Sequence, residues 1–257
     1  MPEPIIRVEN FTAAYDGTVV IDDISFEVNP GEVFVILGGS GCGKSTLLKH
    51  MIGLYKPAAG KILIEGDDIA GAEGGLRMKI LRKIGVMYQS GALFGSMTLM
   101  QNIRLAMEEF TDLPDEAMTL LTKMKLKLVS LAGFENHFPS EVSGGMQKRA
   151  AIARAMALDP RILFLDEPSA GLDPVTSADL DALIKRLART LGVTFVVVTH
   201  ELPSIYSIAD RVIMLDKRVK KIVATGKPAD LRDHSDNAFV RQFFNREASA
   251  QTSGEPA

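Results

Sequence analysis

The sequence is short of cysteine and has no surplus of positive charge. Its single cysteine, Cys42, has no partner for an internal disulfide, as is usual in a reducing compartment. Twenty-nine lysines and arginines stand against 32 aspartates and glutamates, a formal net charge of −3. Without a basic excess we expect no nucleic acid partner. The first residues lack the charged and then apolar pattern of a signal peptide, so we expect a cytoplasmic location.

Long apolar runs are also scarce. The one uncharged stretch of bilayer length covers residues 84–103, and it contains serines, amides and three glycines. These groups would cost several kcal/mol in hydrocarbon, which excludes a membrane span. We predict instead a buried strand followed by an apolar surface groove where another protein docks. Burial of the segment against the rest of the chain is the open alternative.

The pattern of apolar residues predicts strands that alternate with helices. Residues 33–37, 162–165 and 195–198 are continuous apolar runs, typical of parallel strands covered on both faces. Residues 4–28 alternate between apolar and polar, as in a half-solvated antiparallel sheet. Residues 179–189 place apolar side chains at helical spacing. The sequence therefore indicates an α/β fold.

A glycine-rich loop follows the first of these apolar runs and precedes a helical pattern. Its spacing, Gly-x-x-x-x-Gly-Lys-Ser, lets backbone N–H groups surround a polyphosphate at the positive end of a helix. Lys44 would reach the β- and γ-phosphates, and Ser45 would ligate Mg²⁺. Cys42, inside the loop, would make the site sensitive to thiol reagents. We predict a nucleoside triphosphate site made by Gly38, Gly39, Ser40, Gly41, Cys42, Gly43, Lys44, Ser45 and Thr46.

Two adjacent carboxylates end another apolar run. Asp166 and Glu167 follow residues 162–165 at the predicted carboxyl edge of the sheet, where α/β folds bind ligands. Asp166 would hold Mg²⁺, and Glu167 would act as the general base that activates water. Because successive strand residues face opposite ways, a turn at Pro168 is needed to bring both acids to one site.

A Ser-Gly-Gly sequence begins a further helical pattern. Ser143 can cap that helix, which leaves the N–H groups of Gly144 and Gly145 free for an anion. With this start a little upstream of the Asp-Glu strand, the sequence resembles the ATP-binding cassette (ABC) family, whose signature it matches. The resemblance runs in order along nearly the whole chain.

The resemblance implies roles for residues between these motifs. Tyr15 matches the aromatic residue that stacks on adenine, and Asp173 lies in the loop that crosses a dimer. Gln89 matches the loop glutamine, and His200 the switch histidine at the γ-phosphate. The implied catalytic residues are Glu167, His200, Lys44 and Gln89. The implied ligands of Mg²⁺ are Ser45, Gln89 and Asp166.

The resemblance also implies a fold, an α/β P-loop NTPase (RecA-like) core with an N-terminal antiparallel β subdomain and an α-helical subdomain. We expect one ATPase domain over residues 1–240. Residues 1–101 and 157–228 would form the core with its β subdomain, and 102–156 the helical subdomain that carries the signature. Residues 229–257 would form a helical extension and a disordered tail.

Such cassettes act in pairs. The resemblance implies that ATP at the Lys44 loop is covered by Ser143, Gly144 and Gly145 of a second copy, and that hydrolysis drives a membrane permease. Residues 89–94 and Met146 are similar to the ATPases of Mla/Mce-type phospholipid transporters of Gram-negative envelopes. That similarity implies an Mce lipid-binding protein, a small regulatory subunit and the cytoplasmic face of the inner membrane. A cassette for another substrate, or a soluble cassette without transport, is the alternative.

Overall fold

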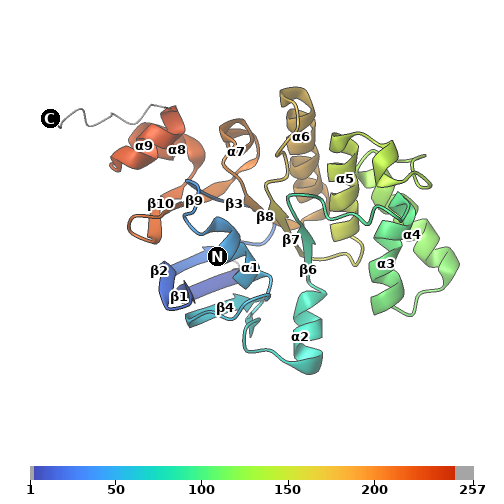
Figure 1. Cartoon of the computed structure of the whole chain (residues 1–257), viewed down its shortest axis with the longest axis horizontal. Helices are drawn as coiled ribbons and strands as arrows, with labels where there is room; N and C mark the ends of the chain where they lie inside the picture. The colour runs from blue at the N-terminus through green and yellow to red at the C-terminus, as the bar shows by residue number, and fades with distance from the viewer. Residues whose placement is uncertain (1–2, 247–257) are drawn as a thin grey trace.

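A computed structural model describes residues 3–246 of the chain (Figure 1). Two sheets and the helices around them make the α/β fold that the sequence predicts. The disordered tail that we expect within residues 229–257 falls largely on residues 247–257, which lie outside the described residues.

The smaller sheet is antiparallel and lies at the N-terminal end of the chain. Its strand order is β2-β1-β4-β5, with bounds β1 Ile6–Tyr15, β2 Thr18–Val28, β4 Ala59–Ile64 and β5 Asp67–Asp68. The predicted alternation is confirmed in β2, where Ile24, Phe26 and Val28 are buried and Ser25 and Glu27 are exposed. One face of this sheet therefore belongs to the core and the other faces solvent.

The larger sheet has the order β10-β9-β3-β8-β7-β6. Its bounds are β3 Val33–Gly38, β6 Ile84–Met87, β7 Ile162–Asp166, β8 Thr194–Val198, β9 Arg211–Asp216 and β10 Lys221–Gly226. All neighbours are parallel except β9 and β10. The continuous apolar runs of β3, β7 and β8 are buried, as predicted. The loops that follow these parallel strands meet at one edge of the sheet.

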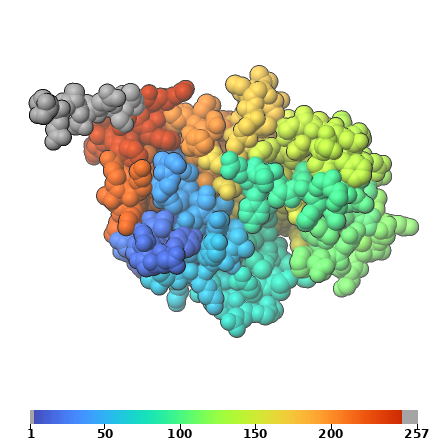
Figure 2. Space-filling model, viewed as in Figure 1, coloured from blue at the N-terminus to red at the C-terminus, as the bar shows by residue number. Residues whose placement is uncertain are grey.

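Helices cover both faces of the larger sheet and build the two ends of the molecule. Their bounds are α1 Lys44–Met51, α2 Gly74–Leu81, α3 Leu99–Phe110, α4 Asp115–Leu128, α5 Gly144–Ala155, α6 Pro174–Leu191, α7 Leu202–Ile208, α8 Pro228–His234 and α9 Ala238–Asn245. Figure 1 shows α3, α4 and α5 together beyond the edge strand β6. Figure 2 shows α8 and α9, in red, at the opposite end.

Two hydrophobic cores lie on the two faces of the larger sheet. Alternate residues of β3 enter different cores, since Val33, Val35 and Leu37 pack with α3, α5 and α6, whereas Phe34 and Ile36 pack with α1 and the smaller sheet. Burial on both faces explains why this strand has no polar position. The sheet is thus a rigid base for the loops at its edge.

The uncharged stretch at residues 84–103 divides into β6, a loop and the first turn of α3. Among the described residues, no helix has both the length and the apolar character needed to cross a membrane. Met87, Leu99 and Ile103 are buried, while Tyr88 and Phe94 are exposed. The segment therefore contributes both to the core and to the surface.

Candidate nucleotide site

The glycine-rich loop after β3 is compact because two of its glycines leave no room for a side chain. A Cβ on Gly38, whose φ is +150°, would lie 2.5 Å from the carbonyl oxygen of Leu215. A Cβ on Gly43, whose φ is +100°, would lie 2.8 Å from Cγ1 of Ile21. Both glycines also take backbone conformations that other residues rarely adopt. This loop, residues 38–46, is called the phosphate loop below.

The phosphate loop has the donors that an anion needs. The amides of Gly41 and Gly43 donate to no protein acceptor within residues 3–246. The first turn of α1, which begins at Lys44, adds further free N–H groups and the positive end of the helix dipole. Nζ of Lys44 donates to the carbonyl oxygens of Gly38, at 2.8 Å, and Gly39, at 3.2 Å. Donors and a cation on one loop fit a polyphosphate.

Cys42 is less accessible than its place in the loop suggests. Its side chain is 2% exposed, and a Cβ on Gly38 would lie 2.6 Å from its Sγ. Burial raises the pKa of the Cys42 thiol, and the charge of Lys44 opposes that effect only in part. Because the thiolate is the reactive form, we expect slow modification, contrary to the sensitivity expected from the sequence.

The second residue of the acidic pair at the end of β7 takes an unusual backbone conformation. Glu167 has a φ of +45°, and its N–H donates to the carbonyl oxygen of Val198 at 2.8 Å. The chain thus turns at Glu167 itself, one residue before the turn expected at Pro168. This turn changes the direction of the Glu167 side chain relative to the strand alternation that would separate it from Asp166.

Glu167 pairs with the predicted switch histidine. Nδ1 of His200, in the loop after β8, donates to Oε1 of Glu167 at 2.8 Å, since a carboxylate can only accept. The second oxygen, Oε2, is buried and has no hydrogen-bond partner among the described residues. The Glu167 side chain is 12% exposed and that of His200 is 61% exposed. One carboxylate oxygen is therefore held, and the other can accept a proton.

Asp166 lies in a strong local field. Burial raises the pKa of its carboxyl, and the neighbouring charge of Glu167 raises it further. Lys44 and Lys49 of α1 and Lys148 of α5 oppose these effects. A cation placed beside Asp166 would stabilise its charged form in the same way.

The predicted Mg²⁺ ligands suit that ion. Gln89 and Asp166 border the same open hollow of about 530 Å³, together with Tyr88, Ser90, Ala170 and Gly171. Residues 3–246 contain no group of three or more His, Cys, Asp and Glu side chains that could hold a metal ion alone. Ser45, Gln89 and Asp166 all offer oxygen, and Mg²⁺ is usually bound by few protein oxygens together with phosphates and water.

Tyr15 ends β1 and presents a half-exposed ring. The ring is 39% exposed, and its centroid lies 5.9 Å from that of Tyr55 in an edge-to-face arrangement. The buried ring of His50, on α1, lies 6.4 Å away. One side of Tyr15 is thus supported by neighbouring rings while part of it is exposed, an arrangement that suits stacking on a purine.

The Ser-Gly-Gly start lies away from the phosphate loop of its own chain. Oγ of Ser143 accepts from the N–H of Met146 at 3.3 Å and caps α5, as predicted. Helix α5 packs against α3, α4, α6 and β6, and Figure 1 shows it well apart from α1. The N–H groups of Gly144 and Gly145, in the first turn of α5, therefore do not meet the Lys44 loop within one chain.

Asp173 acts as a helix cap within the chain. Its Oδ1 accepts from the N–H groups of Val175, at 3.0 Å, and Thr176, at 3.1 Å, at the start of α6. Hydrogen bonds from Thr176 and Val175 lower the pKa of the Asp173 carboxyl. Its role at a dimer interface stays a prediction.

A family model described as ABC transporter matches residues 21–170, more than half of the chain. The chain belongs to the ABC transporter family. The cassette is the ATP-hydrolysing subunit of such a transporter. The comparisons confirm the family and the fold that the sequence predicts.

Known relatives cover nearly all of this cassette. The "probable ribonucleotide transport ATP-binding protein mkl" of Mycobacterium leprae is 40% identical, over 93% of this chain and 68% of that protein. The "intermembrane phospholipid transport system ATP-binding protein MlaF" of Haemophilus influenzae is 37% identical, over 96% and 93%. The cassette MJ0796, solved as a dimer with ADP and phosphate, is 30% identical over 86% and 98%, with a TM-score of 0.77.

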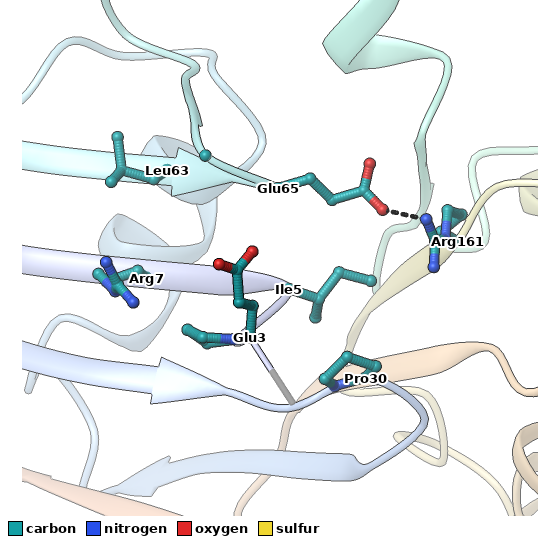
Figure 3. A pocket seen from close by; sticks show the side chains of 9 residues that line it. Glu3, Ile5, Arg7, Pro30, Leu63, Glu65 and Arg161 are labelled. Carbon is teal, nitrogen blue, oxygen red and sulfur yellow. Dashed lines mark ion pairs between the residues drawn. The ribbon is translucent and has the colours of Figure 1, made fainter. Parts of the chain in front are cut away.

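A separate hollow of about 380 Å³ lies at the other edge of the larger sheet (Figure 3). Pro30 and Arg161, which line it, precede β3 and β7, whereas the phosphate loop and Asp166 come at the ends of those strands. Glu65 in this hollow already pairs with Arg161, at 2.5 Å, and with Lys83, at 2.9 Å. Glu65 is thus neutralised within the cassette, and the hollow lies at the opposite end of the strands from the phosphate loop, so it does not compete as the nucleotide site.

Proposed function

We propose that this ABC ATPase powers phospholipid transport in a Gram-negative envelope, as an ATP-sandwich homodimer coupled to a membrane permease. The observation that carries the proposal is the relationship to MlaF, which spans 96% of this chain and 93% of that protein. The similarity at residues 89–94 and Met146 supports it. The proposal includes an Mce lipid-binding protein, a small regulatory subunit and a location at the cytoplasmic face of the inner membrane.

The residues of the site divide the chemistry among themselves. The phosphate loop and Lys44 bind the phosphates, and Tyr15 supports the adenine. Glu167 accepts a proton from water as that water attacks the γ-phosphorus and the bond to ADP breaks. His200 holds Oε1 of Glu167, which leaves Oε2 for the proton. Mg²⁺, held by Ser45, Gln89 and Asp166, would neutralise phosphate charge.

A second copy completes the site. The first-turn N–H groups of α5 lie away from the Lys44 loop of their own chain and can cover ATP bound to another. Met146 adds no polar side-chain contact, because a thioether has no donor and is only a weak acceptor, and its side chain packs against the core. The contacts across the dimer would therefore come from Ser143 and backbone N–H groups. The dimeric state of the relative MJ0796 supports this arrangement.

The permease would dock beside the loop that contains Gln89. A hollow of about 210 Å³ lies between β6, α3 and α5, and apolar side chains dominate its lining, among them Ile84, Val86, Ala106, Ala151 and Leu158. This hollow agrees with the groove predicted from residues 84–103, although α3 and α5 supply part of its wall. A short helix of a membrane subunit is a suitable occupant.

Ribonucleotide transport is the second candidate. The mycobacterial relatives named for that activity are 40% identical to this cassette. The cassette spans about two thirds of their length. A soluble cassette without transport is the third candidate, and no comparison favours it.

Purification of the tagged cassette from membranes, followed by mass spectrometry of proteins and lipids, tests the proposal. We expect a permease, an Mce protein and bound phospholipid. A permease with a nucleotide-binding partner would favour ribonucleotide transport, and a cassette without membrane partners would contradict both. Ala106→Lys, in the groove, should lose the permease, whereas Glu109→Lys, exposed on the same helix, should keep it.

A further inference from the structure

The loop between β6 and α3 is fastened to the helices rather than to the sheet. Nζ of Lys148, on α5, donates to the carbonyl oxygen of Gln89. Nη1 of Arg154, two turns further along the same helix, donates to the carbonyl oxygen of Ala92. The guanidinium of Arg154 also lies 4.9 Å from the ring centroid of Phe94. Residues 88–98 are called the Gln89 loop below.

One face of α5 carries all of these contacts. Lys148, Ala151 and Arg154 are spaced by three residues and so lie along the same side of the helix. Between the two cations, Gly91 of the loop lies flat against Ala151, because a Cβ on Gly91 would be 3.5 Å from the Ala151 Cβ. The first part of the Gln89 loop thus follows the surface of α5 for two turns.

The other end of the loop is held by α3. Asn102, which is 1% exposed, accepts from the N–H of Phe94 at 2.7 Å. Its Nδ2 lies within hydrogen-bond distance of the carbonyl oxygens of Phe94, Met97 and Thr98, at 3.0 to 3.1 Å. The loop is therefore anchored at both ends on the helical group α3 to α5, while the chain joins it to the sheet through Tyr88.

We propose that Lys148 and Arg154 are positioning residues that make the Gln89 loop move with the signature helix α5. The inference deepens the proposed function and rests on it for the role of Gln89 at the nucleotide. A displacement of Gln89 in the site would pull on Lys148 and reach the Ser143 start five residues earlier on the same helix. The joint between the two moving parts would then lie at Tyr88.

Hydrogen exchange of the full chain without nucleotide tests the attachment itself. The reporters are the amides of Gly91, bonded to Tyr88, and Phe94, bonded to Asn102. In Lys148→Met and Arg154→Met we expect these amides to exchange about tenfold faster, the effect of losing one charged hydrogen bond. Lys148→Arg should restore protection at Gly91.

Arg149→Met is the matched control for this measurement. Arg149 is the next residue on α5 and pairs with Asp179 of α6 at 3.7 Å instead of contacting the loop. Its loss should leave exchange at Gly91 and Phe94 unchanged. Equal exchange in the Lys148→Met, Arg154→Met double variant and in Arg149→Met would overturn the proposal. If the double variant unfolds, the same comparison is made between each single variant and Arg149→Met.

ATP turnover and ATP binding measured on the same variants test the consequence. Lys148→Met should lower kcat about tenfold and leave the Kd for MgATP within about twofold, with recovery in Lys148→Arg. Equal kcat in Lys148→Met and wild type would contradict the positioning role. A wild-type chain that binds no MgATP would instead refute the proposed function, and the exchange measurement would still decide the attachment.

Discussion

Glu167 shows how much a single residue's backbone decides. A left-handed conformation costs a non-glycine residue roughly 1–2 kcal/mol. At Glu167 that conformation, with a φ of +45°, coincides with the hydrogen bond to His200 and with an unpaired Oε2. A strained conformation persists only where the surrounding structure stabilises it, here between the ends of β7 and β8. The arrangement supports Glu167 as the base.

Replacing Glu167 by Gln should abolish most hydrolysis without loss of ATP binding. An amide cannot take the proton from water, and a general base contributes about 10²–10⁴-fold to a rate. We expect phosphate release to fall by that order while the Kd for ATP is unchanged. Glu116→Gln, on the exposed start of α4, serves as the control. Hydrolysis at the wild-type rate in Glu167→Gln would remove Glu167 from this role.

Replacing Lys44 by Ala should weaken ATP binding itself. The ammonium lies over the phosphate loop, where it donates to the Gly38 and Gly39 carbonyl oxygens. A charged hydrogen bond is worth about 1.5–3 kcal/mol, so we expect the Kd for MgATP to rise by about 10- to 100-fold. Calorimetric titration measures this rise. Lys56→Ala, an exposed lysine after α1, should leave the Kd as it is.

At the scale of elements, side-chain caps fix where helices begin, and one buried carboxylate affects the stability of the fold. Thr98 and Gln101 form a capping box that begins α3 at Leu99, and Ser143 and Asp173 cap α5 and α6. Asp181, on α6, is 3% exposed and lies beside Ser204 of α7. Burial raises the pKa of Asp181 to about 6 from an ordinary value of 3.8, and its Oδ1 has no partner in the described part of the chain.

Asp181→Asn should therefore stabilise the cassette at neutral pH. Because the native state holds this proton more tightly than the unfolded chain, the free energy of unfolding falls as pH rises from about 4 to about 6 and stays lower above that range. We expect Tm to rise by roughly 2–6 °C at about pH 7.5, with a smaller gain at about pH 4.5. A lower Tm at pH 7.5 would contradict the assignment.

Ser204→Ala provides the opposite change at the same contact. Ser204 lowers the pKa of Asp181, whereas the charge of Glu201 raises it and that of Lys185 lowers it. Loss of the hydroxyl leaves the charged carboxyl with less support, so Tm should fall at about pH 7.5 and change least at about pH 4.5. Thermal unfolding followed by circular dichroism at both pH values checks this difference.

At the scale of the whole molecule, the phosphate loop and the Ser-Gly-Gly start lie on separate parts of one chain. The phosphate loop lies on the sheet, and the signature start lies on the helical group beyond β6. One chain can therefore bind a polyphosphate at its phosphate loop, while the proposed site takes further donors from a second chain. A molecule built in this way would couple ATP binding to association.

Ser143→Arg should separate binding from hydrolysis. The bulky cation would block the first turn of α5 from covering ATP on a second chain, so we expect turnover to fall about tenfold or more. Binding of ATP to the dilute chain should be preserved, because helix α5, which Ser143 caps, packs against α3, α4, α6 and β6 and lies apart from α1 in Figure 1. Thr190→Arg, exposed near the end of α6, is the control. Loss of binding in the dilute variant would contradict the two-chain site.

The sequence alone was enough for the fold class, the phosphate loop and the family. These follow from local patterns of a few neighbouring residues, such as the apolar run of β3 followed by Gly38 to Ser45 and the cap at Ser143. The same patterns indicated the acids after β7 and the histidine after β8 but not how they meet. No motif in the sequence predicted strand β9 or helix α7.

Only the tertiary structure decided which side chains contact one another. The Glu167–His200 bond joins residues from two strands, and Lys148 and Arg154 reach a loop about sixty residues earlier in the chain. Burial of Cys42 and the raised pKa of Asp181 likewise depend on neighbours from other elements. Local spacing determines helices, strands and loops, whereas these contacts arise from the packing of segments that are distant in sequence.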